Sequence, residues 1–226
     1  MYRSGLAILF AVLLAIMAAG PVTAQDSPLE KQEGGRPGQS IDEETPTVSE
    51  EDEPQIDLLE YGAWGVASRD FEQSGEDLEF AFIFSASIAA FPDEETAEDA
   101  FPQVVEAMLE LEQNQDLEEV DVDDVADEQI FLYGEIESNG ITFNLGMLVV
   151  RNGEYLTLAG GLSYETLDLR DDLVALSTFL QGQIEDATPE TGDDLGDMLP
   201  EPDDLPRADE IDDPYVIRDE RIRTAD

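Results

Sequence analysis

The residues of this chain that could do chemistry are almost all carboxylates. There are 56 Asp and Glu residues against 10 Lys and Arg, and the chain has no His and no Cys. These absences exclude Ser-His-Asp and Cys-His nucleophiles, zinc sites of the His/Cys type, and haem or iron–sulfur ligation. Lys31 is the single lysine and lies in a linker-like stretch, which excludes Lys-based catalysis. We therefore expect no catalytic residue and no cofactor.

Paired carboxylates are the catalytic option that remains. Glycoside hydrolysis uses two of them, about 5–10 Å apart across a sugar cleft. Because acids are so abundant here, any cleft would offer such a pair by chance, and the pattern favours a solvated acidic surface. An extracellular carboxylate-dependent hydrolase of the glycosidase type stays open as the alternative function.

Carboxylates also bind metals, and the densest acidic stretch covers residues 116–128. It lacks the glycine at the sixth loop position and the Asp-x-Asp-x-Asp spacing of an EF-hand calcium loop. The sequence therefore predicts no dedicated metal site. Gly34-Gly35 and Gly160-Gly161 lack the Lys and Ser or Thr of a phosphate-binding loop.

The net charge is −46, and the excess of acids is not confined to the ends of the chain. Residues 55–186 hold 32 acids against Arg69, Arg151 and Arg170, a net of −29. Self-repulsion of this size destabilises a compact chain unless salt screens it, so we expect a saline habitat and a melting temperature that rises with salt. Solubility alone is the other explanation. Nucleic acids and anionic membranes are poor partners, because their phosphates bind Lys and Arg.

Residues 1–24 have the order of a secretory signal peptide. A short start with Arg3 precedes an apolar run over 5–20, and Val22-Thr23-Ala24 supplies small residues for cleavage between Ala24 and Gln25. The 16-residue run is shorter than the ~20 residues of a membrane-spanning helix, although an uncleaved anchor stays open. No cysteine is present for a lipid anchor. We expect a secreted protein with no stable membrane insertion and with an unknown extracellular ligand or partner.

Composition divides the rest of the chain into three parts. Residues 25–54 are rich in Glu, Gly, Pro, Ser and Thr and predict a disordered acidic linker. Residues 187–226 are acidic and Pro-rich and predict a mostly disordered tail, in which Tyr215-Val216-Ile217 is a small apolar island. Sustained periodicity is confined to 55–186, which we predict to be one α+β domain.

Two Asn-Gly pairs define the most regular part of this domain. Asn139-Gly140 and Asn152-Gly153 lie between alternating runs and predict two-residue hairpin turns. They predict three antiparallel strands, over 130–138, 141–151 and 154–162. In this register Val149 lies between Ile130 and Leu156, and one whole face of the meander is apolar or glycine.

Further strands complete the predicted sheet. Residues 78–91 alternate as a long central strand, with 61–69 as its hairpin partner and 120–125 as a further short strand. We expect an α+β fold with an antiparallel sheet, made of a β-hairpin and a three-stranded meander.

Two helices are predicted to pack on one face of this sheet. The first begins after Pro92 with Asp93 as its N-cap and has an apolar stripe from Ala97 to Leu109, and Pro102 predicts a kink or a break in it. The second covers 166–185, with Thr166 as its cap.

The other face of the meander carries the candidate ligand groove. Tyr133 and Tyr155 form its walls, and small residues form its floor. The candidate residues are Tyr133, Asn144, Gly146, Tyr155, Ala159 and Gly161. Exposed aromatic patches often mark binding sites, and this groove would suit a peptide, a glycan or a small apolar ligand. The alternative is structural: Tyr133 folds over the cross-strand Gly146 and repairs a weak position.

The order of elements from about 78 to 185 resembles small exported α+β domains of actinobacterial and related lipoproteins, and the extracellular sensor part of some bacterial serine/threonine kinases. The matching features are the strand ending at Phe91-Pro92, the helix after it, Arg151-Asn152-Gly153 within a meander, and a Leu-rich final helix. The resemblance implies a sensing or binding role. It transfers no site residues, because the disulfide cysteines of the kinase sensor domains are absent.

The favoured function is therefore an exported, non-enzymatic binding or sensor-like protein. The carboxylate-dependent hydrolase is one alternative, and a cell-surface structural protein without a specific ligand is the other.

Overall fold

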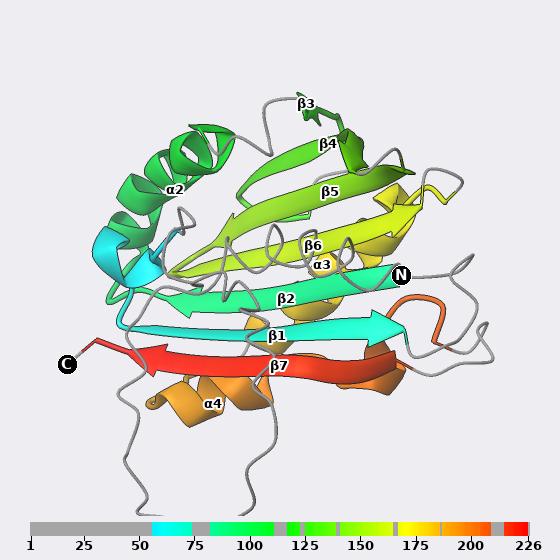
Figure 1. Cartoon of the computed structure of the whole chain (residues 1–226). Helices are drawn as coiled ribbons and strands as arrows, with labels where there is room; N and C mark the ends of the chain where they lie inside the picture. Colours follow the sequence, from blue (N-terminus) through cyan, green and yellow to red (C-terminus); the bar gives the residue numbers. More distant parts are fainter. Residues whose placement is uncertain are drawn as a thin grey trace, which may run out of the picture.

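Seven antiparallel strands form one sheet in the computed structural model, which describes residues 56–73, 82–110, 117–122, 125–138, 141–164, 167–185, 187–208 and 215–225 (Figure 1). The strands are β1 (Gly65–Gln73), β2 (Phe82–Ala90), β3 (Glu118–Glu119), β4 (Glu128–Ser138), β5 (Ile141–Asn152), β6 (Tyr155–Tyr164) and β7 (Tyr215–Thr224). Their order across the sheet is β3-β4-β5-β6-β2-β1-β7. The predicted α+β fold with an antiparallel sheet is confirmed. The predicted signal peptide, its cleavage site at Ala24-Gln25 and the linker over 25–54 lie outside the described residues.

Three helices and two single 3-10 turns accompany the sheet in the described residues. They are η1 (Leu58–Tyr61), α2 (Glu94–Glu110), α3 (Arg170–Ile184), α4 (Gly192–Asp197) and η4 (Pro202–Asp204). Asp93 caps α2 as predicted, because its Oδ1 accepts a hydrogen bond from the backbone N–H of Thr96 at 2.8 Å. The predicted break at Pro102 does not occur. Pro102 and Glu98, whose carbonyl lacks its helical donor, are both exposed, so water can replace the missing bond. The helix predicted over 166–185 begins only at Arg170, with Leu169 rather than Thr166 as its N-cap, and Thr166 itself lies outside the described residues.

The meander keeps its predicted faces but not all of its predicted pairs. Ile130 lies opposite Val149, as predicted for β4 and β5. The register of β5 and β6 differs by two residues, because Val149 lies opposite Leu158 rather than Leu156. The turn there consists of Gly153 and Glu154, and Gly153 has the positive φ of 55°. A shift of two leaves every side chain on its predicted face.

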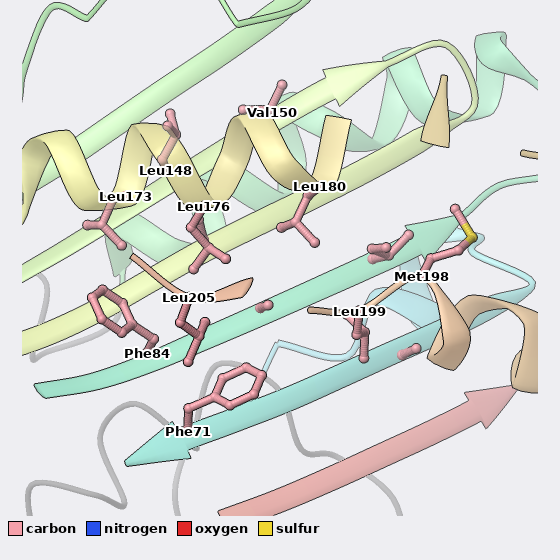
Figure 2. Close-up of a cluster of buried hydrophobic side chains, with 14 of the residues drawn as sticks. Phe71, Phe84, Leu148, Val150, Leu173, Leu176, Leu180, Met198, Leu199 and Leu205 are labelled. Carbon is pink, nitrogen blue, oxygen red and sulfur yellow. The ribbon is translucent and has the colours of Figure 1, made fainter. Parts of the chain in front are cut away.

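Both faces of the sheet are covered by helices, which corrects the prediction that both helices pack on one face. α2 packs on the face that carries Met147 and Val149, called here the α2 face. α3 and α4 pack on the opposite face, which carries Leu148 and Ala159 and is called the α3 face; Figure 2 shows the leucines of α3 directed at the sheet there. The reason lies in the central strands. β2 is buried at every position, and a strand that is apolar on both sides needs cover on both sides.

The C-terminal residues belong to the fold, which corrects the prediction of a mostly disordered tail over 187–226. β7 pairs with the whole length of β1, with a bulge in the register next to Asp70. α4 packs against β1 and β7 on the α3 face. This close approach requires glycine, because a Cβ on Gly192 or Gly196 would lie 2.8 or 2.7 Å from the side chain of Ile222. The folded unit therefore extends well beyond the predicted end at 186.

Arg69 holds β7 and the segment before it onto the sheet. Its side chain on β1 is only 8% exposed. Nε donates a hydrogen bond to Oε2 of Glu220 on β7 at 2.7 Å. Nη1 donates to the carbonyl oxygen of Pro200 and to Oε1 of Glu201, each at 2.9 Å. Charge-assisted hydrogen bonds are the stronger kind, so this guanidinium is the main polar link between β1 and the C-terminal segment.

We expect Arg69→Gln to lower the free energy of unfolding by about 2–4 kcal/mol, because the buried Pro200 carbonyl and both carboxylates lose their donor. The amide protons of β7 should exchange with solvent faster in the variant, while those of β5 change little. Arg170→Gln is the control: Arg170 is 51% exposed and pairs with the nearby Asp168, so its loss should cost less than about 1 kcal/mol. Urea unfolding and amide exchange are measured for both variants. Equal decreases in their free energies of unfolding would contradict this role of Arg69.

Candidate functional site

The structure brings the predicted groove residues together on the α3 face, but α3 fills the groove. These residues are Tyr133, Asn144, Gly146, Tyr155, Ala159 and Gly161. A Cβ on Gly146 would lie 2.5 Å from Cδ1 of Leu173 and 2.8 Å from Cδ2 of Tyr133, and a Cβ on Gly161 would lie 3.0 Å from Leu173. The prediction of an open ligand groove is therefore wrong at this place. The structural alternative, in which Tyr133 covers Gly146, describes the packing correctly.

The polar atoms of the predicted groove serve to position α3. The Tyr133 hydroxyl accepts a hydrogen bond from the backbone N–H of Leu169 at 3.2 Å, at the start of the helix. Nδ2 of Asn144 donates to the carbonyl oxygen of Leu167 at 2.7 Å. Tyr155 is buried beneath the same layer. These contacts hold α3 against the sheet and leave these atoms engaged with the protein itself.

An open groove lies instead on the α2 face, between α2 and β4. Its volume is about 820 Å³, within the usual range of ligand sites. Its apolar part is a stripe of α2 made of Phe101, Val105 and Leu109, faced by Ile130 of β4. Leu109 is 43% exposed, whereas the α2 residues that pack on the sheet are buried. The residues that line this acid-rimmed groove are Glu98, Asp99, Phe101, Pro102, Val105, Glu106, Leu109, Glu110, Glu119, Glu128, Gln129 and Ile130.

Carboxylates surround the apolar stripe of the acid-rimmed groove. The helix contributes Glu98, Asp99, Glu106 and Glu110, β3 contributes Glu119, and β4 contributes Glu128. Glu128 is neutralised by Arg151, whose Nε lies 2.6 Å from its Oε2. The other five carboxylates form no ion pair with any described residue, and no basic residue is among the lining residues. The groove is therefore apolar along its centre and negatively charged along its rim.

A second polar cluster crosses β2, β1 and β7 on the α2 face. This polar row consists of Ser68, Asp70, Ser85, Ser87, Asp219 and Arg221. Ser85 Oγ donates a hydrogen bond to Oδ1 of Asp70 at 2.6 Å, and Asp219 forms an ion pair with Arg221. Burial raises the pKa of the Asp70 carboxyl, although the Ser85 hydroxyl and Arg221 act in the opposite direction. The polar row contains two carboxylates on neighbouring strands, but each already has a partner within the row.

A small cavity and the acidic clusters of the described residues offer no second candidate site. A cavity under α2 lined by Ile56, Met108 and Leu158, among others, measures about 20 Å³, which is space for about one water molecule. Within the described ranges, no group of three or more carboxylates is arranged to hold a metal ion. None of the helices there has both the length and the apolar character needed to cross a membrane.

We expect Gly146→Ala to lower the free energy of unfolding by about 1–3 kcal/mol, because the added methyl group displaces both Leu173 and the ring of Tyr133. Gly160→Ala is the matched control on the neighbouring strand. A Cβ there would meet its nearest atoms at 3.6 Å, an ordinary contact, so the change should be neutral or stabilising by about 0.5 kcal/mol. Chemical unfolding of both variants measures the difference. If Gly146→Ala were as stable as the control, α3 would not be seated on Gly146.

The buried Asp70 predicts a specific dependence of stability on pH. A carboxyl with a raised pKa in the folded state favours folding when protonated, and this contribution is lost as the pH rises from its unfolded pKa through its folded pKa. Asp70→Asn keeps the acceptor for Ser85 and cannot ionise. Relative to the wild type, this variant should therefore gain stability as the pH rises through the ordinary pKa of Asp and then through the raised pKa of Asp70, and stay level above it.

The control for this experiment is Asp93→Asn. The hydroxyl and backbone N–H of Thr96 hold the pKa of Asp93 below its usual value, so this variant should lose stability relative to the wild type over the rising pH range. Urea unfolding at a series of pH values gives both curves. If both variants changed in stability relative to the wild type in the same direction as the pH rises, burial would not be the main influence on the pKa of Asp70.

Comparison with known proteins adds one weak likeness. No family model matches this chain, and no curated protein matches it. A solved structure from Bacteroides thetaiotaomicron VPI-5482 is similar to this chain at 12% identity and a TM-score of 0.29, over 52% of this chain and 47% of the other. The match thus spans less than half of that protein, and a likeness at this level carries no information on fold or function.

Proposed function

We propose that this protein is an exported, non-enzymatic binding protein of saline surroundings, and that the acid-rimmed groove is its binding site. The observation that carries the proposal is an apolar stripe of α2 that the core buries only in part. Phe101, Val105 and Leu109 form a row at four-residue spacing that lines the groove. Phe101 and Val105 are half-buried, with Phe101 packed against the core, and Leu109 is exposed. Exposed apolar residues gathered in a concave, polar-rimmed site are typical of binding surfaces.

The signal-like order of residues 1–24 and the acidity of the chain support export and a saline habitat. These two parts of the proposal rest on the amino-acid sequence alone. The resemblance to exported sensor-like domains agrees with a binding role.

The hydrolase alternative requires two desolvated carboxylates in a cleft. Asp70 and Asp219 are two carboxylates that lie opposite each other on β1 and β7. However, Asp219 is paired with Arg221, and Asp70 is held by Ser85. Neither of the two residues lines the acid-rimmed groove. This arrangement favours binding over hydrolysis.

The groove is tested first with Nile red, a neutral apolar dye whose fluorescence rises on binding. We expect the chain over residues 25–226 to bind it, and Leu109→Gln to weaken binding about fivefold or more, because the variant loses a half-exposed apolar side chain from the groove. Val216→Gln is the control: Val216 is 39% exposed, close to the 43% of Leu109, but lies on β7. Equal effects of the two variants, or no binding to the wild type, would contradict the proposal.

A further inference from the structure

The shape of the acid-rimmed groove indicates the kind of partner that fits it. α2 packs on β5 and β6, and β4 is the next strand of the sheet (Figure 1). The groove is lined by residues of α2, β3 and β4. Helices that pack side by side lie about 8–10 Å apart. The groove therefore occupies the place that a second helix would take on the α2 face.

The length of the groove sets the length of this helix. The α2 wall extends from Glu98 to Glu110, which corresponds to about 18 Å at a rise of 1.5 Å per residue. A partner helix of about three to four turns would fill it. Within that length Phe101, Val105 and Leu109 form one ridge at four-residue spacing, the geometry that a partner helix with apolar residues at i, i+4 and i+7 can match.

The rim determines the charge of the partner. Asp99, Glu106, Glu110 and Glu119 form no ion pair with a described cation, and Arg151 attracts Glu98 without forming an ion pair with it. Basic residues at the flanks of a docked helix would form ion pairs with both walls, whereas an acidic helix would be repelled by the rim and by the net charge of −46.

A second copy of this chain is a poor occupant of the groove. The described helices α2, α3 and α4 carry a single basic residue among them, Arg170. Two acidic rims would meet in such a dimer. The complementary occupant is a segment with the opposite charge and an apolar face.

We propose that the acid-rimmed groove binds a basic amphipathic helix of a partner protein. This inference rests on the proposed function and adds the chemistry of the partner. The helix lies beside α2 on the face of β4, with its apolar residues on Phe101, Val105 and Leu109 and its Lys or Arg residues on the two acidic walls.

The test uses the chain over residues 25–226 and synthetic helical peptides of about 14 residues with Leu at i, i+4 and i+7. One peptide carries Lys at the flanking positions, a second carries Gln there, and a third is the Lys peptide with a central Pro. Fluorescence anisotropy measures the dissociation constants. We expect the Lys peptide to bind about tenfold or more tightly than the Gln peptide, and this advantage to shrink as salt rises from about 0.1 M to about 0.5 M. The Pro peptide should lose most of its affinity, because it cannot form a continuous helix.

Two protein variants locate the binding. Glu106→Lys combined with Glu110→Lys should weaken binding of the Lys peptide about tenfold, because the variant reverses two charges on the rim of the groove. The control variant combines Asp171→Lys with Glu185→Lys, two exposed positions at the two ends of α3 on the other face of the sheet. It makes the same change in net charge and should weaken binding of the Lys peptide less than about threefold.

The outcomes separate the two proposals. If Nile red binds in the groove but the Lys and Gln peptides bind equally, the partner is not basic, and the inference fails while the proposed function stands. Equal binding of the Pro peptide would show that the occupant is not a helix. A dimer of the wild type that Leu109→Gln dissolves would assign the groove to a second copy. If neither the dye nor any peptide binds, both proposals fail.

Discussion

Basic residues are scarce in this acidic chain, and the fold places several of its arginines between segments that are distant in the sequence. Arg69 links β1 to β7 and to Glu201, and Arg151 links β5 to Glu128 of β4 at 2.6 Å and to Glu94 of α2 at 3.8 Å. Arg207 and Asp172 join the segment after η4 to α3 at 2.8 Å, and Arg223 pairs with Asp57 before η1. With a net charge of −46, these segments would repel one another without a cation between them. The architecture therefore depends on a few guanidinium groups, most of which serve more than one partner.

The same scarcity shapes the acid-rimmed groove. Arg151 is directed at Glu128 and the first turn of α2, so the acids further along the helix have no arginine beside them. Their mutual repulsion is relieved in part by salt, whose screening length falls from ~10 Å at 0.1 M to ~3 Å at 1 M. A bound cationic segment would relieve it at closer range and with geometric specificity. Dissolved salt and a bound cationic partner would therefore reduce the same repulsion between carboxylates, salt over the whole surface and the partner at the groove.

Local periodicity is sufficient to predict which residues of the meander share a face. It does not predict the pairing of strands that are far apart in the sequence. The shift of the β5–β6 register by two residues, which sets Val149 opposite Leu158, cannot be read from hydrophobic alternation, because a shift of two leaves that alternation unchanged. β7 is harder still. Its sequence, YVIRDERIRT, is half charged, and it pairs with β1 about 150 residues earlier in the chain. What holds it there is Arg69, together with the glycines of α4, and neither signal is recognisable before the partners are known.

The proposed binding surface could not be placed from the sequence for a related reason. Periodicity shows which residues share a face, but not which helix covers it, so the row of Gly146 and Gly161 looks the same whether it is open or filled by Leu173. The sequence signal for the proposed surface is the width of the apolar stripe of α2. Its apolar positions from Ala97 to Leu109 form an arc wider than the part that the sheet buries fully, which is Ala97, Ala100, Val104 and Met108. A helix on the outside of a domain needs an apolar stripe of about 100° to face its core. Where the stripe is wider than the sheet can bury, the excess width points to a surface that another molecule covers.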